Sequence, residues 1–147
     1  MQTEPSLILL VEDDPAHTEI VRRNFEKFKV PNQLVTLSDG QAALDYLFRR
    51  NGFSEPESSR RPSIVLLDLR LPKVDGLQVL KAVKDDPILQ NIPVIILTTS
   101  ANESDIAKAY EYRANSYLVK PVDFSQFSEL LDAFGSYWLA WNKYPQP

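Results

Sequence analysis

Short apolar runs alternate with longer amphipathic segments along the whole chain. Four runs are nearly continuous and a fifth, weaker one alternates between apolar and polar positions: residues 7–11, 64–68, 94–98 and 117–119, and then 33–37. Each run is short enough for a single strand, and near-continuous apolarity is typical of parallel strands that are covered on both faces. The pattern therefore predicts a sheet of five strands.

The segments between these runs carry apolar residues three and four positions apart, as amphipathic helices do. We expect four of these helices to begin beside residues that favour N-caps: Asp14, Asp75, Asn102 and Asp123. The second helix follows Ser38-Asp39-Gly40, and Gly52 stands at a plausible C′ position for its end. Five β-α units in a row predict an α/β fold, with a parallel sheet, helices on both faces and right-handed crossovers.

The length of 147 residues fits one domain, with a core at about 6–134, a polar surface loop at 51–62 and a C-terminal aromatic extension at 135–147. Hydrophobic residues make up 44% of the chain and charged residues 24%, so a sizeable core can form. The net charge of −4 disfavours nucleic acid as a partner, and the lack of cysteine excludes disulfides and thiolate metal sites. We expect a cytoplasmic protein, because neither a signal peptide nor a transmembrane run is recognisable.

Polar residues follow the predicted strands directly. Glu12-Asp13-Asp14 follow the first strand, Asp68 ends the third, Thr98 ends the fourth and Lys120 follows the fifth. Because ligands of open α/β sheets bind at the carboxyl ends of the strands, we expect these side chains to share one edge.

Each of these residues has an ordinary structural explanation. Asp13 or Asp14 suits a helix cap, Asp68 a turn, Thr98 a strand end and Lys120 a solvated surface. Together they are harder to dismiss, because neighbouring carboxylates repel by roughly 4 kcal/mol per pair at an effective dielectric near 20. Mg²⁺ prefers such all-oxygen ligands, and a lysine adds a second positive charge. The combination predicts phosphoryl transfer to a carboxylate, which would give an acyl phosphate.

Four motifs in this order resemble the receiver domain of two-component response regulators, over about residues 6–134: LLVEDDP, IVLLDLRLPKVDG, VIILTTS and YLVKP. The resemblance implies a flavodoxin-like (βα)5 fold whose strand order is 2-1-3-4-5. It implies a phosphorylation-switched protein of a phosphorelay, with Asp68 accepting the phosphoryl group from a phosphohistidine of a sensor histidine kinase. Beyond its own phosphorylation and dephosphorylation such a protein is not an enzyme.

The resemblance also implies a role for each residue of the site. Asp14 and Asp68 would ligate Mg²⁺ (or Mn²⁺) directly, Asp13 through a water, and the backbone carbonyl of Arg70 would complete the set. Lys120 would pair with the phosphoryl oxygens.

Two further expectations concern the switch and the fifth strand. Lys120-Pro121 would be a cis peptide, and Thr98 with Tyr117 would form the switch pair.

Receivers often carry glycine where this chain has Arg113, at the end of the fourth helix, and Asn115 is an alternative for the left-handed position there.

Within the family the chain is similar to single-domain regulators that are paired with cyanobacterial phytochrome kinases. We expect no DNA-binding output domain after the fifth helix; in addition, the loop 51–62 is long and the tail is aromatic. This similarity implies a phytochrome-type kinase as partner. It also implies a homodimer through the fourth helix, fifth strand, fifth helix and tail. Interfaces are enriched in exposed aromatics, so we expect four in this one: Tyr137, Trp138, Trp141 and Tyr144. One helix stripe has room to bury about two of them, and the alternative is a tail that folds back on its own monomer.

A phosphohydrolase, a constitutive scaffold and a phosphohistidine relay through His17 are the alternative functions for this sequence. An Mg²⁺-dependent phosphohydrolase with an aspartyl-phosphate intermediate typically carries a second aspartate two residues after the nucleophile, where this chain has Arg70. A constitutive scaffold is disfavoured because all five chemical positions are present. His17, the only histidine, is expected to be an ordinary polar residue on the first helix.

Overall fold

A single parallel sheet organises the molecule. The computed structural model describes residues 6–28, 30–55 and 59–144. In these parts five parallel strands have the order β2-β1-β3-β4-β5, as predicted: β1 (Ser6–Val11), β2 (Asn32–Leu37), β3 (Ile64–Leu67), β4 (Val94–Thr98) and β5 (Ser116–Val119). Each strand lies within one residue of the apolar run that predicted it.

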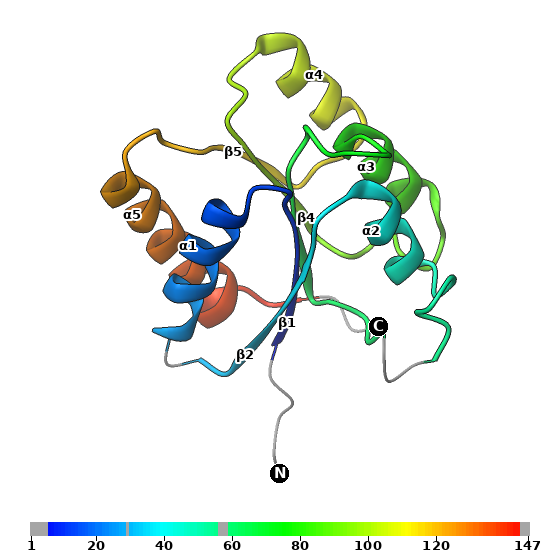
Figure 1. Ribbon diagram of the computed structural model, residues 1–147, viewed down its shortest axis with the longest axis horizontal. Helices are drawn as coiled ribbons and strands as arrows, with labels where there is room; N and C mark the ends of the chain where they lie inside the picture. Colours follow the sequence, from blue (N-terminus) through cyan, green and yellow to red (C-terminus); the bar gives the residue numbers. More distant parts are fainter. Residues whose placement is uncertain (1–5, 29, 56–58, 145–147) are drawn as a thin grey trace.

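Helices cover both faces of this sheet, with α1 and α5 on one side and α2 and α3 on the other (Figure 1). Their bounds are α1 (Pro15–Glu26), α2 (Gly40–Leu47), α3 (Gly76–Asp85), α4 (Glu103–Glu111), α5 (Phe124–Gly135) and the π-helical segment η2 (Ser136–Trp141). The four predicted N-caps are confirmed, since each side chain accepts a backbone N–H of the first turn. Among the described helices none has the length and apolar character that a membrane crossing requires.

Alternate residues of each strand feed two separate cores. In β1, Leu9 and Val11 pack toward α2, α3 and α4, while Ile8 and Leu10 pack toward α1 and α5. Successive side chains of a strand point to opposite faces, so a run with apolar residues at every position serves both cores. The strands are thus held rigidly, and the residues that follow them are fixed in space.

The end of α2 differs from the prediction. The helix ends at Leu47 with Phe48 as its C-cap, and Arg49 (φ 56°) takes the left-handed position that we expected of Gly52. Gly52 also has a positive φ, of 97°, but it lies in the following loop. Residues 56–58 of the predicted loop lie outside the described residues.

The end of α4 also corrects the prediction. Arg113 itself adopts the left-handed conformation (φ 71°), and Asn115 does not replace it. The side chain of Arg113 donates to Lys84 O at 2.7 Å and to Asp85 Oδ1 at 2.8 Å, so it ties the end of α4 to the end of α3. Asn115 instead accepts the backbone N–H of Val94 at 2.9 Å.

The C-terminal aromatics divide into two pairs. Trp138 and Tyr144 pack against the core beneath α1 and α5, and the hydroxyl of Tyr144 donates to Trp138 O. Tyr137 and Trp141 are 56% and 80% exposed. Trp138 and Tyr144 therefore contact their own domain, while an interface role of the four aromatics stays a prediction. Residues 145–147 lie outside the described residues.

Candidate functional site

Three carboxylates gather where β1 and β3 end. Val11 of β1 pairs with Leu67 of β3, so Glu12 and Asp68 leave the sheet at the same level. Both are buried, at 4% and 8% exposure. Asp13 is exposed, and carboxylate oxygens of Glu12, Asp13 and Asp68 lie within 4.8 Å of one another. The sheet register therefore builds an acidic cluster that continues from the core to the surface.

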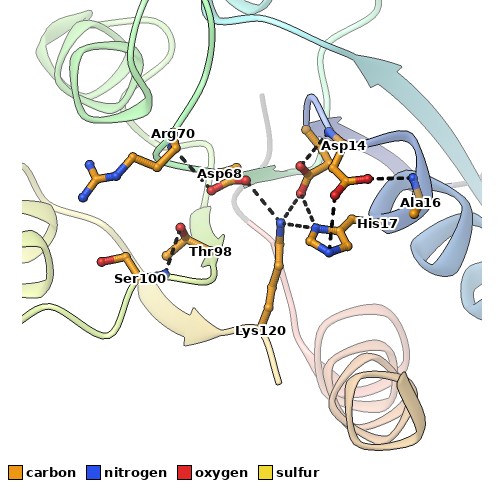
Figure 2. A network of polar contacts seen from close by, with 9 residues as sticks. Asp14, Ala16, His17, Asp68, Arg70, Thr98, Ser100 and Lys120 are labelled. Carbon is orange, nitrogen blue, oxygen red and sulfur yellow. Dashed lines mark hydrogen bonds and ion pairs between the residues drawn. The ribbon is translucent and has the colours of Figure 1, made fainter. Parts of the chain in front are cut away.

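Lys120 compensates this cluster from the end of β5. It is 4% exposed, and its backbone N–H extends the β4–β5 ladder by donating to Thr98 O at 2.7 Å. Its ammonium donates to Asp68 Oδ2 at 3.2 Å and to Glu12 Oε1 (Figure 2). Buried charges are tolerated when they are paired and hydrogen-bonded, and Lys120 meets that condition.

Burial makes Glu12 an unusual carboxyl group. It raises the pKa of Glu12 to about 7, although the hydrogen bond and the positive charge of Lys120 pull in the other direction. Desolvation disfavours the charged form of an acid, so the ionisation of Glu12 lies within the neutral range.

Asp14 lies outside the acidic cluster. Its side chain caps α1 by accepting the backbone N–H of Ala16 at 2.9 Å, and this hydrogen bond lowers the pKa of Asp14. The structure therefore brings Asp13 and Asp68 together with Glu12 rather than with Asp14, while the ligand role of each residue stays a prediction. The sequence could have indicated Glu12 as well. Glu12 directly follows the last residue of β1, Val11, in the same way that Asp68 directly follows the last residue of β3, Leu67.

His17 belongs to the site, contrary to the expectation of an ordinary helix residue. Its Nδ1 lies 3.0 Å from Lys120 Nζ, and its ring meets Phe127 of α5 edge-on with centroids 5.9 Å apart. Helical side chains lean toward the N-terminus of their helix, so a residue in the first turn of α1 covers the strand ends beneath it. This tilt of helical side chains could have indicated from the sequence that His17 reaches the site.

The predicted switch pair meets at one loop residue. Thr98 is fully buried, and its Oγ1 lies 3.4 Å from the backbone N of Ser100, which donates to it. The hydroxyl of Tyr117 donates to the carbonyl of the same Ser100 at 2.9 Å. Burial raises the pKa of Tyr117. Thr98 and Tyr117 are therefore linked through the backbone between β4 and α4.

Arg70 makes a side-chain contact that the sequence did not suggest. Its Nη2 lies 2.5 Å from Asp105 Oδ2 of α4, and Ser100 Oγ donates to the same oxygen at 2.6 Å. Asp105 is 9% exposed. The loop after β3, the loop after β4 and the first turn of α4 are thereby joined, while the ligand role of the Arg70 carbonyl stays a prediction.

The expected cis peptide before Pro121 is wrong. The Lys120–Pro121 bond is trans, because the described residues contain no cis peptide bond. The trans form is the ordinary state even of X-Pro bonds, by about 0.5–1 kcal/mol.

The acidic cluster fits a divalent cation. Three carboxylates whose oxygens approach within 4.8 Å repel one another unless a cation lies between them. Oxygen-only donors suit Mg²⁺ or Mn²⁺. A surface pocket of about 500 Å³, lined by Glu12, Asp13, residues of α1 and the end of β2, leads to the cluster from solvent.

Comparisons with known proteins agree with this geometry. Residues 8–132 match the response regulator receiver domain family. The probable methanogenesis regulatory protein FilR2 of Methanothrix harundinacea is 44% identical over 144 residues, which cover 98% of this chain and 90% of FilR2. Response regulator Rcp1 of Synechocystis is 40% identical over 135 residues, which cover 92% of this chain and 90% of Rcp1.

Solved structures give the same result. The crystal structure of the Mn²⁺-bound form of Rcp1 superposes with a TM-score of 0.92 at 38% identity, covering 97% of this chain and 100% of that one. The phosphorylated cyanobacterial phytochrome response regulator RcpA also superposes with a TM-score of 0.92, at 36% identity over 97% of this chain and 99% of RcpA. With the strand order, the family match and these relatives in agreement, the chain belongs to the response regulator receiver domains.

Proposed function

We propose that this protein is a phosphorylation switch that accepts a phosphoryl group on Asp68 from a phosphohistidine of a sensor histidine kinase. One observation carries the proposal: Asp68 ends a buried strand between a cluster of carboxylates and the ammonium of Lys120, 3.2 Å from Asp68 Oδ2. Such an arrangement holds a carboxylate rigidly and surrounds it with the means to balance the charge of an incoming phosphoryl group.

The transfer is a displacement at phosphorus. An Asp68 oxygen attacks, a P–O bond forms, the P–N bond to the donor imidazole breaks, and its electron pair stays on the leaving nitrogen. Lys120 supplies a fixed positive charge beside the attacked group. Glu12, Asp13 and Asp68 would hold Mg²⁺ or Mn²⁺, together with the Arg70 carbonyl, and the ion would supply further neutralising charge on the phosphoryl oxygens.

The output would pass through the loop between β4 and α4. A dianionic group on Asp68 attracts the hydroxyl of Thr98, and Thr98 is hydrogen-bonded to Ser100. Ser100 in turn holds the Tyr117 hydroxyl and Asp105. A shift of Thr98 would therefore alter the outer face of α4 and β5, where a signal can be read by another protein.

We also propose a phytochrome-type histidine kinase as the phosphodonor and a homodimer on the face of α4, β5 and α5. The donor is suggested by the likeness to RcpA, a phytochrome response regulator. FilR2 is similar over nearly the whole chain and is named for methanogenesis, so the donor needs a direct comparison. The dimer is suggested by exposed apolar residues at the end of β5 and the start of α5, Val119, Val122 and Phe124, and by Tyr137 and Trp141 in η2 after α5.

The protein would catalyse only its own phosphorylation and dephosphorylation. Two residues after Asp68, where a phosphohydrolase would carry an acid–base carboxylate, stands Arg70, which binds Asp105. The acyl phosphate would then persist long enough to act as a signal rather than as an intermediate of steady turnover.

The test is a mass measurement. The protein is incubated with Mg²⁺ and acetyl phosphate, and we expect an adduct of one phosphoryl group that is absent in Asp68→Asn and absent when the metal is chelated. An adduct that survives Asp68→Asn overturns the proposal, and release of phosphate over many turnovers favours the phosphohydrolase. Transfer from a phosphorylated phytochrome kinase, compared with a non-phytochrome histidine kinase at equal concentration, tests the donor.

A further inference from the structure

Among the described residues, the ammonium of Lys120 has three acceptors. Two follow the ends of strands, and the third lies on helix α1. Two are carboxylate oxygens of Glu12 and Asp68; the third is Nδ1 of His17, 3.0 Å from Nζ (Figure 2). A lysine ammonium has three N–H donors and no lone pair, so all three contacts are donated by Lys120. Nδ1 of His17 must therefore carry the lone pair, and the ring proton lies on Nε2, which faces Asp14 Oδ2 at 3.7 Å.

The imidazole is itself held in place. His17 lies in the first turn of α1, and its ring stands at 81° to the ring of Phe127 in α5. Its side chain is 24% exposed, between two helices that pack against each other. A group held this way can fix the position of a flexible lysine whose four-carbon stem otherwise has many rotamers.

We propose that His17 is a positioning residue for the phosphoryl-transfer reaction: its Nδ1 holds the Lys120 ammonium against Asp68. The inference rests on the proposed function. The other two acceptors, Glu12 and Asp68, belong to the acidic cluster, whose carboxylates would also be the ligands of a divalent cation. The imidazole lies on the helix side of Lys120, outside this cluster. His17 thus keeps the ammonium in place when the carboxylates are engaged.

Substitutions of His17 test the position of the acceptor atom. In His17→Asn the amide oxygen lies near the place of Nδ1, in His17→Gln an amide reaches toward the place of Nε2, and His17→Leu retains only the packing on Phe127. We expect His17→Leu to be phosphorylated by acetyl phosphate about tenfold more slowly, since a hydrogen bond to a charged group is lost. His17→Asn should recover most of the rate and His17→Gln should not, while Glu26→Gln, which is exposed in the last turn of α1 and outside the pocket, stays within about twofold.

Two outcomes of this experiment would overturn the inference. One is an unchanged rate in His17→Leu. The other is equal recovery by His17→Asn and His17→Gln, which would show that any polar filler suffices. If the wild-type protein takes up no phosphoryl group, the proposed function fails instead, and the second measurement decides about His17.

The second measurement needs no phosphoryl transfer and no variant of His17. Because the chain has one histidine, ¹⁵N-labelled histidine gives one imidazole whose two nitrogens are assigned by NMR. We expect an unprotonated Nδ1 and a proton on Nε2 in the wild type, with a changed Nδ1 shift in Lys120→Met. A proton on Nδ1, or an Nδ1 shift that Lys120→Met leaves unchanged, contradicts the inference.

Discussion

Among the described residues two lysines are buried, and they lie at opposite ends of the sheet. Lys120 is 4% exposed at the carboxyl end of β5, and Lys84 is 5% exposed near the amino ends of β4 and β5. Each ammonium has three acceptors. Those of Lys84 are Gln90 O at 3.0 Å, Ile92 O at 2.9 Å and Asn115 Oδ1 at 3.0 Å.

The difference lies in the acceptors. Lys84 meets only neutral oxygens, and burial, with the nearby charge of Arg113, lowers its pKa to about 8. Lys120 meets two carboxylates and an imidazole. Neutral backbone oxygens have no other cation to bind, so Lys84 joins α3 to the start of β4 and β5 permanently. Carboxylates can be claimed by a metal or converted to an acyl phosphate, so the contacts of Lys120 can be rearranged. Equal burial thus gives a structural contact at one end and a reactive one at the other.

The largest effect is expected from Lys120→Met, on phosphoryl transfer. Removing a preorganised charge beside the reacting group slows such reactions by about 10²–10³-fold. The rate of adduct formation on Asp68 with acetyl phosphate measures it. Lys84→Met is the matched control, with the same substitution at the same burial, and should stay within about threefold of wild type. Similar rates for the two variants would break the comparison.

The order reverses when stability is measured. Lys84→Met removes the donor of two backbone oxygens, Gln90 O and Ile92 O, while Asn115 Oδ1 keeps the N–H of Val94. We expect the free energy of unfolding to fall by about 2–3 kcal/mol, since each buried unsatisfied group costs about 1–3 kcal/mol. The free energy of unfolding should fall less in Lys120→Met, because Glu12 can take up a proton and so lose the charge that Lys120 balanced. Urea unfolding of both variants decides this, and a larger loss in Lys120→Met would contradict it.

The sequence predicted the residues around Lys120 but not those around Lys84. Asp68, Thr98 and Lys120 could be placed at the sheet edge because a polar residue at the carboxyl end of a strand lies there. The sequence did not show which of Glu12, Asp13 and Asp14 lie beside Asp68, because this depends on the register of β1 against β3.

Residues on helices were harder to place. His17 and Asp105 enter the site through the orientation of their helices, and the helical periodicity says which face is apolar, not which polar residue reaches a neighbouring strand end. Lys84 could not be found at all, because its acceptors lie up to 31 residues away and two of them are backbone carbonyls, which every residue carries.

The pH dependence of stability should reveal the titratable partner of Lys120. The pKa of Glu12 is about 7 in the folded protein and 4.5 in its unperturbed state. Between these values the folded state binds the proton more tightly, so the free energy of unfolding falls as pH rises from about 4.5 to above 7. We expect a fall of about 3 kcal/mol from this group, because each unit of pKa difference corresponds to about 1.4 kcal/mol. Urea unfolding at several pH values, with a chelator present to remove divalent cations, measures this fall in the free energy of unfolding.

Glu12→Gln should remove that part of the slope, because the amide does not titrate. Lys84→Met should keep it, because none of the three acceptors of Lys84 is an acid. A slope that persists in Glu12→Gln would assign the titration to another group.

The smallest effect concerns Arg113, beside Lys84. Its left-handed backbone (φ 71°) is unfavourable for any residue with a Cβ, and its side chain holds Lys84 O and Asp85 Oδ1 in return. Arg113→Gly and Arg113→Ala both lose these contacts, but only alanine keeps the backbone strain. We therefore expect the glycine variant to be more stable than the alanine variant by about 1 kcal/mol. Phosphoryl transfer should be unchanged in both, because this end of the sheet is structural. Equal stability of the two variants would show that the chain relieves the left-handed turn in another way, and a change in transfer rate would show that the two ends are coupled.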